Sequence, residues 1–288
     1  MKRFILIACL FILLLVSVSN TMYMQEDLKM PYKVAGEGRP VVLVPGGLTG
    51  WASWDSFVPH FSKEKKVVQV QLLNVQYGLE NKALPEFYGV NTESKALEAA
   101  LSAANVSGKA DFIGWSYGAM VLLDYALNNP EKVRTLTLIE PPALWVIKRD
   151  LDNDPELRKA KDYLSVVPGT DATITEEDLE EFLGFAGLSK PGESVRDLPQ
   201  WNGWLKFRQS LRSNSVVLKH DDDPERLRKF AAPVLLVKGT GSAYFLHRII
   251  DGCERNFPHS QVVEFPGAHA AHLVSREQFL EAVESFQK

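Results

Sequence analysis

The chain has 288 residues, of which 45% are hydrophobic, 24% charged and 10% aromatic. This composition is typical of a globular protein and excludes a disordered, collagen-like or coiled-coil chain. Its 32 basic residues are outnumbered by 36 acidic ones, for a net charge of −4. The chain therefore lacks the excess positive charge that binding to phosphate backbones requires, and no nucleic-acid partner is expected.

Residues 1–19 are predicted to be a sorting signal or an anchor. Lys2 and Arg3 precede an apolar stretch from Phe4 to Val18, and small residues stand near its end. This order is typical of a secretory signal peptide, so we expect an exported protein, periplasmic or extracellular. The stretch is shorter than the roughly 20 apolar residues of a membrane span. An uncleaved anchor is the alternative, and it would be the protein's one membrane association; a lipoprotein cleavage box before Cys9 is a third interpretation.

From Val41 onward, short apolar runs alternate with longer amphipathic stretches. This pattern predicts an α/β protein with a mostly parallel, doubly wound sheet. The predicted strands are Val41–Val44, Val67–Leu73, Ala110–Gly114, Val133–Ile139, Pro233–Lys238 and Gln261–Phe265. The predicted helices of the same alternation are Ser94–Ala104, Ala119–Asn128, Ala243–Asn256 and Arg276–Gln287.

The alternation lapses between residues 143 and 222, which are rich in charge and aromatics and look helical at 155–166, 175–186 and 203–218. We therefore predict a core in two parts, residues 30–142 and 223–288, interrupted by a helical insertion, residues 143–222. Six aromatic side chains of the insertion could line an apolar cleft or form the insertion's own core. They are Trp145, Phe182, Phe185, Trp201, Trp204 and Phe207.

Neither a metal nor a cofactor is expected. The run Asp221–Asp223 could bind a hard cation, but Asp223 followed by Pro224 is an order of residues that begins a helix. His269 and His272 stand three apart, yet no carboxylate lies close by in the sequence to complete a zinc site. The chain has no phosphate-binding loop and no Gly-x-Gly-x-x-Gly after its first strand, so no nucleotide cofactor is implied.

The most specific local signal is the pentapeptide Gly114–Gly118, Gly-Trp-Ser-Tyr-Gly. It matches Gly-x-Ser-x-Gly and stands where an apolar strand passes directly into an apolar helix. A serine in that context is held on a strained turn, with its hydroxyl above the sheet and the helix amides directed at it. We therefore predict that Ser116 is a nucleophile and that its neighbours Trp115 and Tyr117 line the substrate pocket.

With these motifs, the chain resembles the α/β-hydrolase superfamily in its capped, serine esterase and lipase-like form, over about residues 30–288. Pro45-Gly46-Gly47 resembles the family's His-Gly-x oxyanion loop, with a proline in place of the histidine. The resemblance implies that the amide of Gly47, or alternatively that of Leu48, joins the amide of Tyr117 in binding the oxyanion. It also implies that the insertion is a helical cap over the serine.

The resemblance implies a histidine that takes the serine's proton, on the loop after the last strand. His269 lies there, in a segment that resembles the family's Gly-His-x-x-His-Leu ending, although Ala268 replaces the glycine. His272 is the alternative base.

The third member of the triad is expected to be Glu140. The family's usual acid follows the strand Pro233–Lys238, but this chain reads Gly-Thr-Gly-Ser at residues 239–242. A subset of the superfamily places the acid after the preceding strand, where Glu140 stands. A structural carboxylate at the cap loop is the other interpretation of Glu140, and Asp251 and Asp111 are remote alternatives for the acid.

The resemblance thus implies a serine hydrolase that cleaves a small or medium apolar ester through an acyl-enzyme, with Trp115, Leu48 and Trp51 as substrate-binding residues. Trp54 is a similar candidate. A carbon–carbon bond hydrolase or a perhydrolase could use the same triad. From another class, a ligand-binding or signalling protein could keep the fold without turnover. The partner expected in each enzymatic case is a small-molecule substrate.

Overall fold

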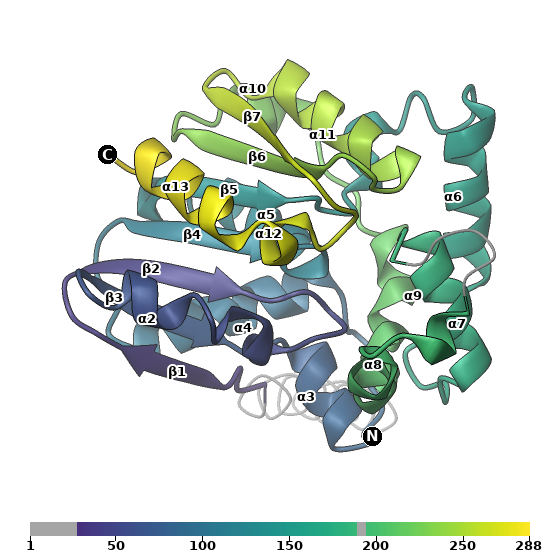
Figure 1. The fold of residues 1–288 in the computed structure, drawn as a ribbon. Helices are drawn as coiled ribbons and strands as arrows, with labels where there is room; N and C mark the ends of the chain where they lie inside the picture. The colour runs from purple at the N-terminus through teal and green to yellow at the C-terminus, as the bar shows by residue number, and fades with distance from the viewer. Residues whose placement is uncertain (1–27, 189–193) are drawn as a thin grey trace, which may run out of the picture.

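The computed structural model describes residues 28–188 and 194–288, and the predicted leader lies outside them. In this part of the chain, no helix has the length and apolarity to cross a bilayer. Seven strands of the described residues form one sheet in the order β1-β3-β2-β4-β5-β6-β7. They are β1 (Tyr32–Ala35), β2 (Arg39–Val44), β3 (Lys65–Val70), β4 (Ala110–Trp115), β5 (Val133–Ile139), β6 (Val234–Gly239) and β7 (Ser260–Phe265). Only β1 runs antiparallel to its neighbour among these strands (Figure 1). The predicted mostly parallel, doubly wound α/β sheet is confirmed.

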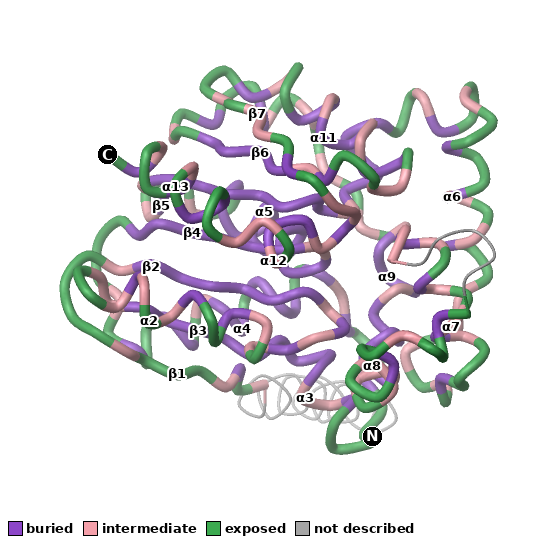
Figure 2. The backbone as a smooth tube through the Cα atoms, in the orientation of Figure 1, coloured by how far each residue is buried: buried purple, intermediate pink, exposed green. Residues whose placement is uncertain are grey.

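The central strands β2, β4, β5 and β6 are mostly apolar because both faces of the sheet are covered there, and Figure 2 shows them largely buried. In Val41–Val44, the even-numbered valines pack into one hydrophobic cluster and the odd-numbered residues into another. The first face is covered by α3 (Leu73–Leu79), α4 (Val90–Ala103), α5 (Tyr117–Asn128), α10 (Pro224–Arg228) and α11 (Tyr244–Asn256). The second is covered by a 3-10 turn, η1 (Trp51–Trp54), and by α2 (Val58–Phe61), α12 (Ala271–Val274) and α13 (Arg276–Phe286). Another 3-10 turn, η2 (Pro130–Lys132), leads into β5.

Between β5 and α10 the chain leaves the sheet and forms what we call the cap segment, the described part of residues 143–222. Its α-helices are α6 (Pro155–Val166), α7 (Glu176–Phe185), α8 (Trp201–Phe207) and α9 (Asn214–Val217). Its 3-10 helices are η3 (Leu144–Ile147), η4 (Val195–Asp197) and η5 (Arg208–Ser213). Figure 1 shows α6 to α9 beyond the ends to which the parallel strands point. The cap segment therefore lies over the carboxyl edge of the sheet, where loops that follow the strands converge.

The predicted strand Val67–Leu73 is wrong at its end, since β3 stops at Val70 and α3 begins at Leu73. The apolar run continues, but the backbone turns because the carboxylate of Glu93 accepts hydrogen bonds from the amides of Leu73 and Asn74. That partner lies about 20 residues away in the sequence, so no local pattern reveals the helix start.

Two further elements differ from the prediction. The helical stretch at 203–218 is broken into α8, η5 and α9, and the hydroxyls of Ser210 and Ser213 each donate to a carbonyl three residues earlier. Such local side-chain bonds compete with regular helix. Strand β1 escapes prediction because it is a short edge strand with largely exposed side chains. By contrast, Asp223 does accept a bond from the Glu225 amide at the start of α10.

Candidate active site

Ser116 stands at the junction of β4 and α5 in a strained backbone conformation. Its φ of 55° and ψ of −126° lie in a region that residues other than glycine rarely adopt. The strain is held by neighbours: the Ser116 amide donates to the Ile139 carbonyl at 2.8 Å, and the Met120 amide donates to the Ser116 carbonyl at 3.1 Å. The turn thereby lifts the serine side chain out of the sheet at the start of a helix.

The two glycines of the pentapeptide are required by close packing around this turn. A Cβ at Gly118 would lie 2.2 Å from the carbonyl oxygen of Pro45. One at Gly114 would lie 2.9 Å from the Cα of Ala119. Both contacts involve backbone, so the turn could not form as it does with any side chain at either position.

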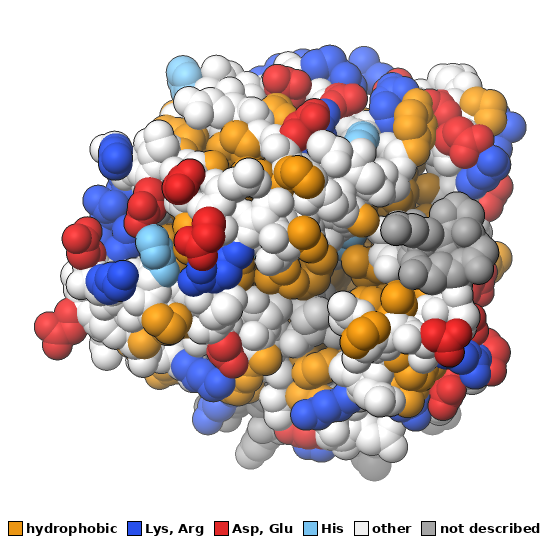
Figure 3. Space-filling model, viewed as in Figure 1, with side chains coloured by type: hydrophobic (Ala, Val, Ile, Leu, Met, Phe, Trp, Pro, Cys, Tyr) orange, Lys and Arg blue, Asp and Glu red, His pale blue; other side chains and the backbone are white. Residues whose placement is uncertain are grey.

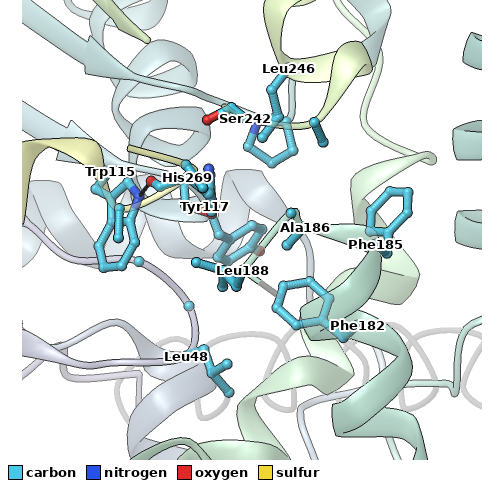
Figure 4. Close-up of a pocket in the computed structure, with 18 of the residues that line it drawn as sticks. Leu48, Trp115, Tyr117, Phe182, Phe185, Ala186, Leu188, Ser242, Leu246 and His269 are labelled. Carbon is cyan, nitrogen blue, oxygen red and sulfur yellow. Dashed lines mark hydrogen bonds between the residues drawn. The ribbon is translucent and has the colours of Figure 1, made fainter. Parts of the chain in front are cut away.

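His269 reaches Ser116 from the loop between β7 and α12. Its Nε2 lies 2.8 Å from Ser116 Oγ, and the residue is buried, with 4% of its surface exposed. The indole N–H of Trp115 donates to the His269 carbonyl at 2.8 Å, the interaction drawn as a dashed line in Figure 4. The residue before the nucleophile thus fixes the loop that carries the imidazole.

Glu140 completes the chain of hydrogen bonds from the end of β5. Its Oε2 lies 2.7 Å from His269 Nδ1, and its Oε1 accepts the Gly239 amide at 2.7 Å. A carboxylate can only accept, so His269 donates through Nδ1 and leaves Nε2 to accept from Ser116. The structure therefore brings the three predicted catalytic residues together, with Glu140 only 1% exposed and its φ at 46°.

The alternative acids lie in other environments. Asp251 pairs with Lys238 at 3.5 Å. Asp111 is buried and bonded to the guanidinium groups of Arg39 and Arg134. In place of the usual carboxylate after β6, the amide of Gly239 at the end of that strand donates to Glu140.

His272, the alternative base, is fully buried, and neither of its ring nitrogens has a hydrogen-bond partner among the described residues. Burial lowers the pKa of His272 to about 3, with the nearby His269 as a lesser cause. The ring packs against Trp115, Trp54 and Phe279. His272 is therefore a neutral aromatic packing residue of the second face of the sheet.

The backbone amides of Gly47 and Tyr117 have no acceptor among the described residues, and both residues line the same cavity as Ser116. Tyr117 begins α5, and the first amides of a helix have no intrahelical acceptor. The Gly47 loop lies against it, since a Cβ at Gly47 would be 3.4 Å from the Tyr117 Cβ. The Leu48 amide is likewise without an acceptor in this part of the chain. These groups can together hold an oxygen that gains negative charge.

A cavity of about 1100 Å³ opens above Ser116 between the core and the cap segment. Its apolar lining residues include Leu48, Trp115, Tyr117, Leu164, Phe182, Phe185, Leu188, Trp204, Phe245 and Leu246. Figure 4 shows Phe182, Phe185 and Ala186 of the cap segment facing Tyr117 and Leu246 of the core. In Figure 3, hydrophobic side chains gather where these two parts meet. None of the described lining residues is Lys, Arg, Asp or Glu.

The predicted pocket residues divide between the cavity and other sites. Leu48 and Trp115 line the cavity. Trp51 does not; its ring lies under the ammonium of Lys33, 4.2 Å from the ring centre. Its amide donates to the side-chain oxygen of Gln71 at 2.8 Å. Another residue of η1, Ser53, does line the cavity.

Other aromatic candidates also divide. Trp54 is buried in the core, and so is Trp145. Trp201 belongs to the hydrophobic core of the cap segment, against which Phe207 packs. Sequence reasoning missed Phe245 and Leu246 on α11, because an apolar helix face looks the same whether it covers a sheet or a ligand cavity.

Similarity to known proteins covers most of the chain. Residues 39–275 match the family described as alpha/beta hydrolase fold. The chain is 28% identical over 171 residues to the 2-hydroxy-6-oxo-2,4-heptadienoate hydrolase of Pseudomonas putida, covering 54% of this chain and 58% of that protein. It thus spans under two thirds of that relative's length.

A second relative is similar over nearly its whole length. The pimeloyl-[acyl-carrier protein] methyl ester esterase of Nitrosomonas europaea is 24% identical over 258 residues, covering 86% of this chain and 95% of that protein. Among solved structures, a hydrolase from Pseudomonas aeruginosa superposes with a TM-score of 0.69 at 19% identity, covering 89% of this chain and 93% of that one. On the family match and this fold, the chain belongs to the alpha/beta hydrolase fold family.

Proposed function

We propose that the protein is a serine hydrolase that cleaves a small or medium, uncharged and apolar carboxylic ester through an acyl-enzyme intermediate. The observation that carries the proposal is the pair of hydrogen bonds from Ser116 to His269 and from His269 to Glu140, at 2.8 and 2.7 Å, on the floor of an apolar cavity. Nucleophile, base and orienting acid are all within hydrogen-bond reach.

In the acylation step, Ser116 Oγ attacks the ester carbonyl carbon while its proton passes to His269 Nε2. The carbonyl oxygen becomes an oxyanion and is bound by the amides of Gly47 and Tyr117. When the tetrahedral intermediate collapses, the bond to the alcohol breaks and His269 gives its proton to the departing oxygen. Glu140 remains ionised and stabilises the charged imidazolium.

In the deacylation step, a water molecule attacks the acyl carbon and His269 takes one of its protons. The second tetrahedral intermediate uses the same two amides. Its collapse breaks the bond to Ser116 Oγ, which regains the proton from His269, and the acid product leaves. One water is consumed in each cycle, and no metal or cofactor is required by these steps.

The charge of the cavity favours an uncharged ester over an anionic substrate. Transfer of a carboxylate from water into an apolar site without a cation costs several kcal/mol, and the described lining residues include no Lys or Arg. The name of the Nitrosomonas relative, a methyl ester esterase, agrees with this choice. The name of the Pseudomonas putida relative, a dienoate hydrolase, supports carbon–carbon bond hydrolysis on the same triad as the second candidate.

The test is hydrolysis of paired substrates, a neutral dimethyl diester and the corresponding anionic monomethyl ester. We expect the neutral ester to have the higher kcat/KM, by about 100-fold. The anionic ester must bury its carboxylate without a cation, which costs about 3 kcal/mol more than burying the neutral ester. Ser116→Ala should abolish turnover. Ser102→Ala, at an exposed position of α4 outside the cavity, is the control and should leave turnover unchanged. Equal turnover by Ser116→Ala and the wild type would contradict the proposal.

We also propose that the protein is exported through residues 1–19, on the basic and apolar pattern of that segment. The N-terminal residue of the protein recovered from fractionated cells tests this. Cleavage near Asn20 in an exported fraction supports a signal peptide, an intact Met1 in the membrane fraction supports an anchor, and an intact Met1 in the cytoplasmic fraction contradicts both.

A further inference from the structure

A buried carboxylate outside the triad, Glu93 on α4, is fully enclosed and fully bonded. It accepts the Leu73 amide at 2.9 Å, the Asn74 amide at 2.8 Å and the Tyr88 hydroxyl at 2.6 Å. Burial raises the pKa of Glu93 to about 7, and these three hydrogen bonds oppose the rise. Burying an ionisable group lowers the stability of the fold unless the group is well paired. The three hydrogen bonds to Glu93 supply that pairing.

One chain of hydrogen bonds, which we call the first arm, runs from Glu93 through Tyr88 to Tyr117, the residue after Ser116. The Tyr88 and Tyr117 hydroxyls are 3.0 Å apart, and both side chains are buried. When Glu93 is ionised, Tyr88 gives its only hydroxyl proton to the carboxylate. Tyr117 must then donate to Tyr88, so the hydrogen bonds run in one direction from α5 to α4. The backbone amide of the same Tyr117 is one of the two oxyanion donors proposed above.

The other arm leads to the second oxyanion donor and to the cap segment. Asn74 lies in the first turn of α3 under Glu93, and its side-chain nitrogen lies 3.0 Å from Ser213 Oγ and 3.1 Å from the Ser210 carbonyl of η5. The same nitrogen lies 3.4 Å from the Gly47 carbonyl. A Cβ at Gly47 would be 3.1 Å from this nitrogen. The loop of Gly47 therefore packs directly against the side-chain amide of Asn74.

We propose that Glu93, Tyr88 and Asn74 form a positioning unit that fixes the two oxyanion donors relative to each other and to the cap segment. Glu93 anchors both arms. Tyr88 restrains the start of α5 through Tyr117, and Asn74 supports the loop of Gly47. None of the three touches the reacting atoms, and the inference rests on the proposed serine hydrolase function.

The arrangement matters for turnover because oxyanion donors act only when held near 2.7–3.1 Å from the developing charge. Complete loss of one donor lowers kcat about 10²- to 10³-fold in related chemistry. Loosening one donor without removing it should have a smaller effect, roughly tenfold. Substrate binding to the apolar cavity does not depend on these amides, so KM should change little.

The test uses Tyr88→Phe in the full chain, assayed with a neutral ester at pH 8.5, where Glu93 is ionised. The matched control is Tyr125→Phe. Like Tyr117, Tyr125 lies on α5. Like Tyr88, it donates to a carboxylate of α4, here Glu98, at 2.7 Å. It stands eight residues farther from Ser116 than Tyr117 does. Both variants lose one hydroxyl that donates to a carboxylate of α4.

We expect kcat to fall roughly tenfold in Tyr88→Phe, with KM within twofold of the wild-type value, and to stay within twofold in Tyr125→Phe. Tyr117→Phe breaks the same link from its other end. The double variant of Tyr88 and Tyr117 should therefore be no slower than the slower single variant.

Two results would overturn the inference alone: equal kcat values for Tyr88→Phe and Tyr125→Phe, or losses in the two single variants that multiply in the double variant. A wild-type protein that labels no serine with an organophosphonate and hydrolyses no ester would instead overturn the proposed function, and the inference with it.

Discussion

At the scale of single residues, the triad depends on two side chains that stand on strained backbone. Ser116 and Glu140 both have φ between 46° and 55°, and each follows the end of a strand in the middle of the sheet. Such conformations cost about 1–3 kcal/mol each, and here each places a side chain of the proposed triad. Glu140 is tied further by the Gly239 amide, so it has no freedom to turn from His269.

Glu140→Gln should lower kcat on a good ester by about four orders of magnitude. The amide can donate to His269 Nδ1 and so favours the imidazole tautomer that cannot accept the serine proton. Steady-state kinetics with Asp251→Asn as the control check this, since Asp251 is the alternative acid and pairs with Lys238. A wild-type kcat in the Glu140→Gln variant would show that the acid lies elsewhere.

His272→Phe should retain kcat within about threefold and leave the pH profile of turnover unchanged. The ring makes only packing contacts among the described residues, and its pKa of about 3 keeps it neutral at working pH. His269→Phe should abolish turnover. Loss of activity in both variants, at equal melting temperature, would mean that His272 takes part in proton transfer.

At the scale of elements, the sequence predicts what local pattern determines and misses what distant contacts determine. The central strands are predictable because a strand buried on both faces is apolar at every position, as in Val41–Val44, whose side chains pack on both faces of the sheet. The serine turn is predictable because a motif coincides with a strand-to-helix change. The start of α3 is not, because Glu93 supplies its capping acceptor from another helix. The placement of Trp51 and Phe245 relative to the cavity depends on tertiary packing in the same way.

Glu93 should make the free energy of unfolding depend on pH. Its folded-state pKa is raised from 4.5 to about 7, so the folded state binds its proton more tightly than the unfolded state. The resulting stabilisation is present below about pH 4.5 and is lost as the pH rises through 7, by on the order of 3 kcal/mol.

Urea unfolding at pH 5 and at pH 8 measures this contribution. Between these values, the wild type should lose more stability than Glu93→Gln, which has no titrating group at the site. Glu98→Gln on the same helix is the control and should not flatten the wild-type slope, since the pKa of Glu98 is lowered, not raised. Parallel slopes for the wild type and Glu93→Gln would contradict the assignment.

At the scale of the whole molecule, the site is built where two parts of the chain meet. The sheet edge supplies Ser116, Glu140 and His269, and the cap segment supplies one side of the apolar wall, including Phe182 and Phe185. The sequence motifs shared with capped hydrolases are enough to predict Ser116, His269 and Glu140, which the structure brings within hydrogen-bond distance of one another. They cannot locate the cavity wall, because which aromatic residues face the ligand depends on how the cap helices pack over the core.

The central claim is that Ser116 carries a covalent acyl group during turnover. The most direct measurement is the mass of the intact protein and of its peptides after the wild type is mixed with a slowly hydrolysed aryl ester and quenched in acid. The account predicts one acyl group per chain, on the peptide that contains Ser116, and none in Ser116→Ala. Turnover of the ester with no acyl group, or with the acyl group on another residue, would contradict it.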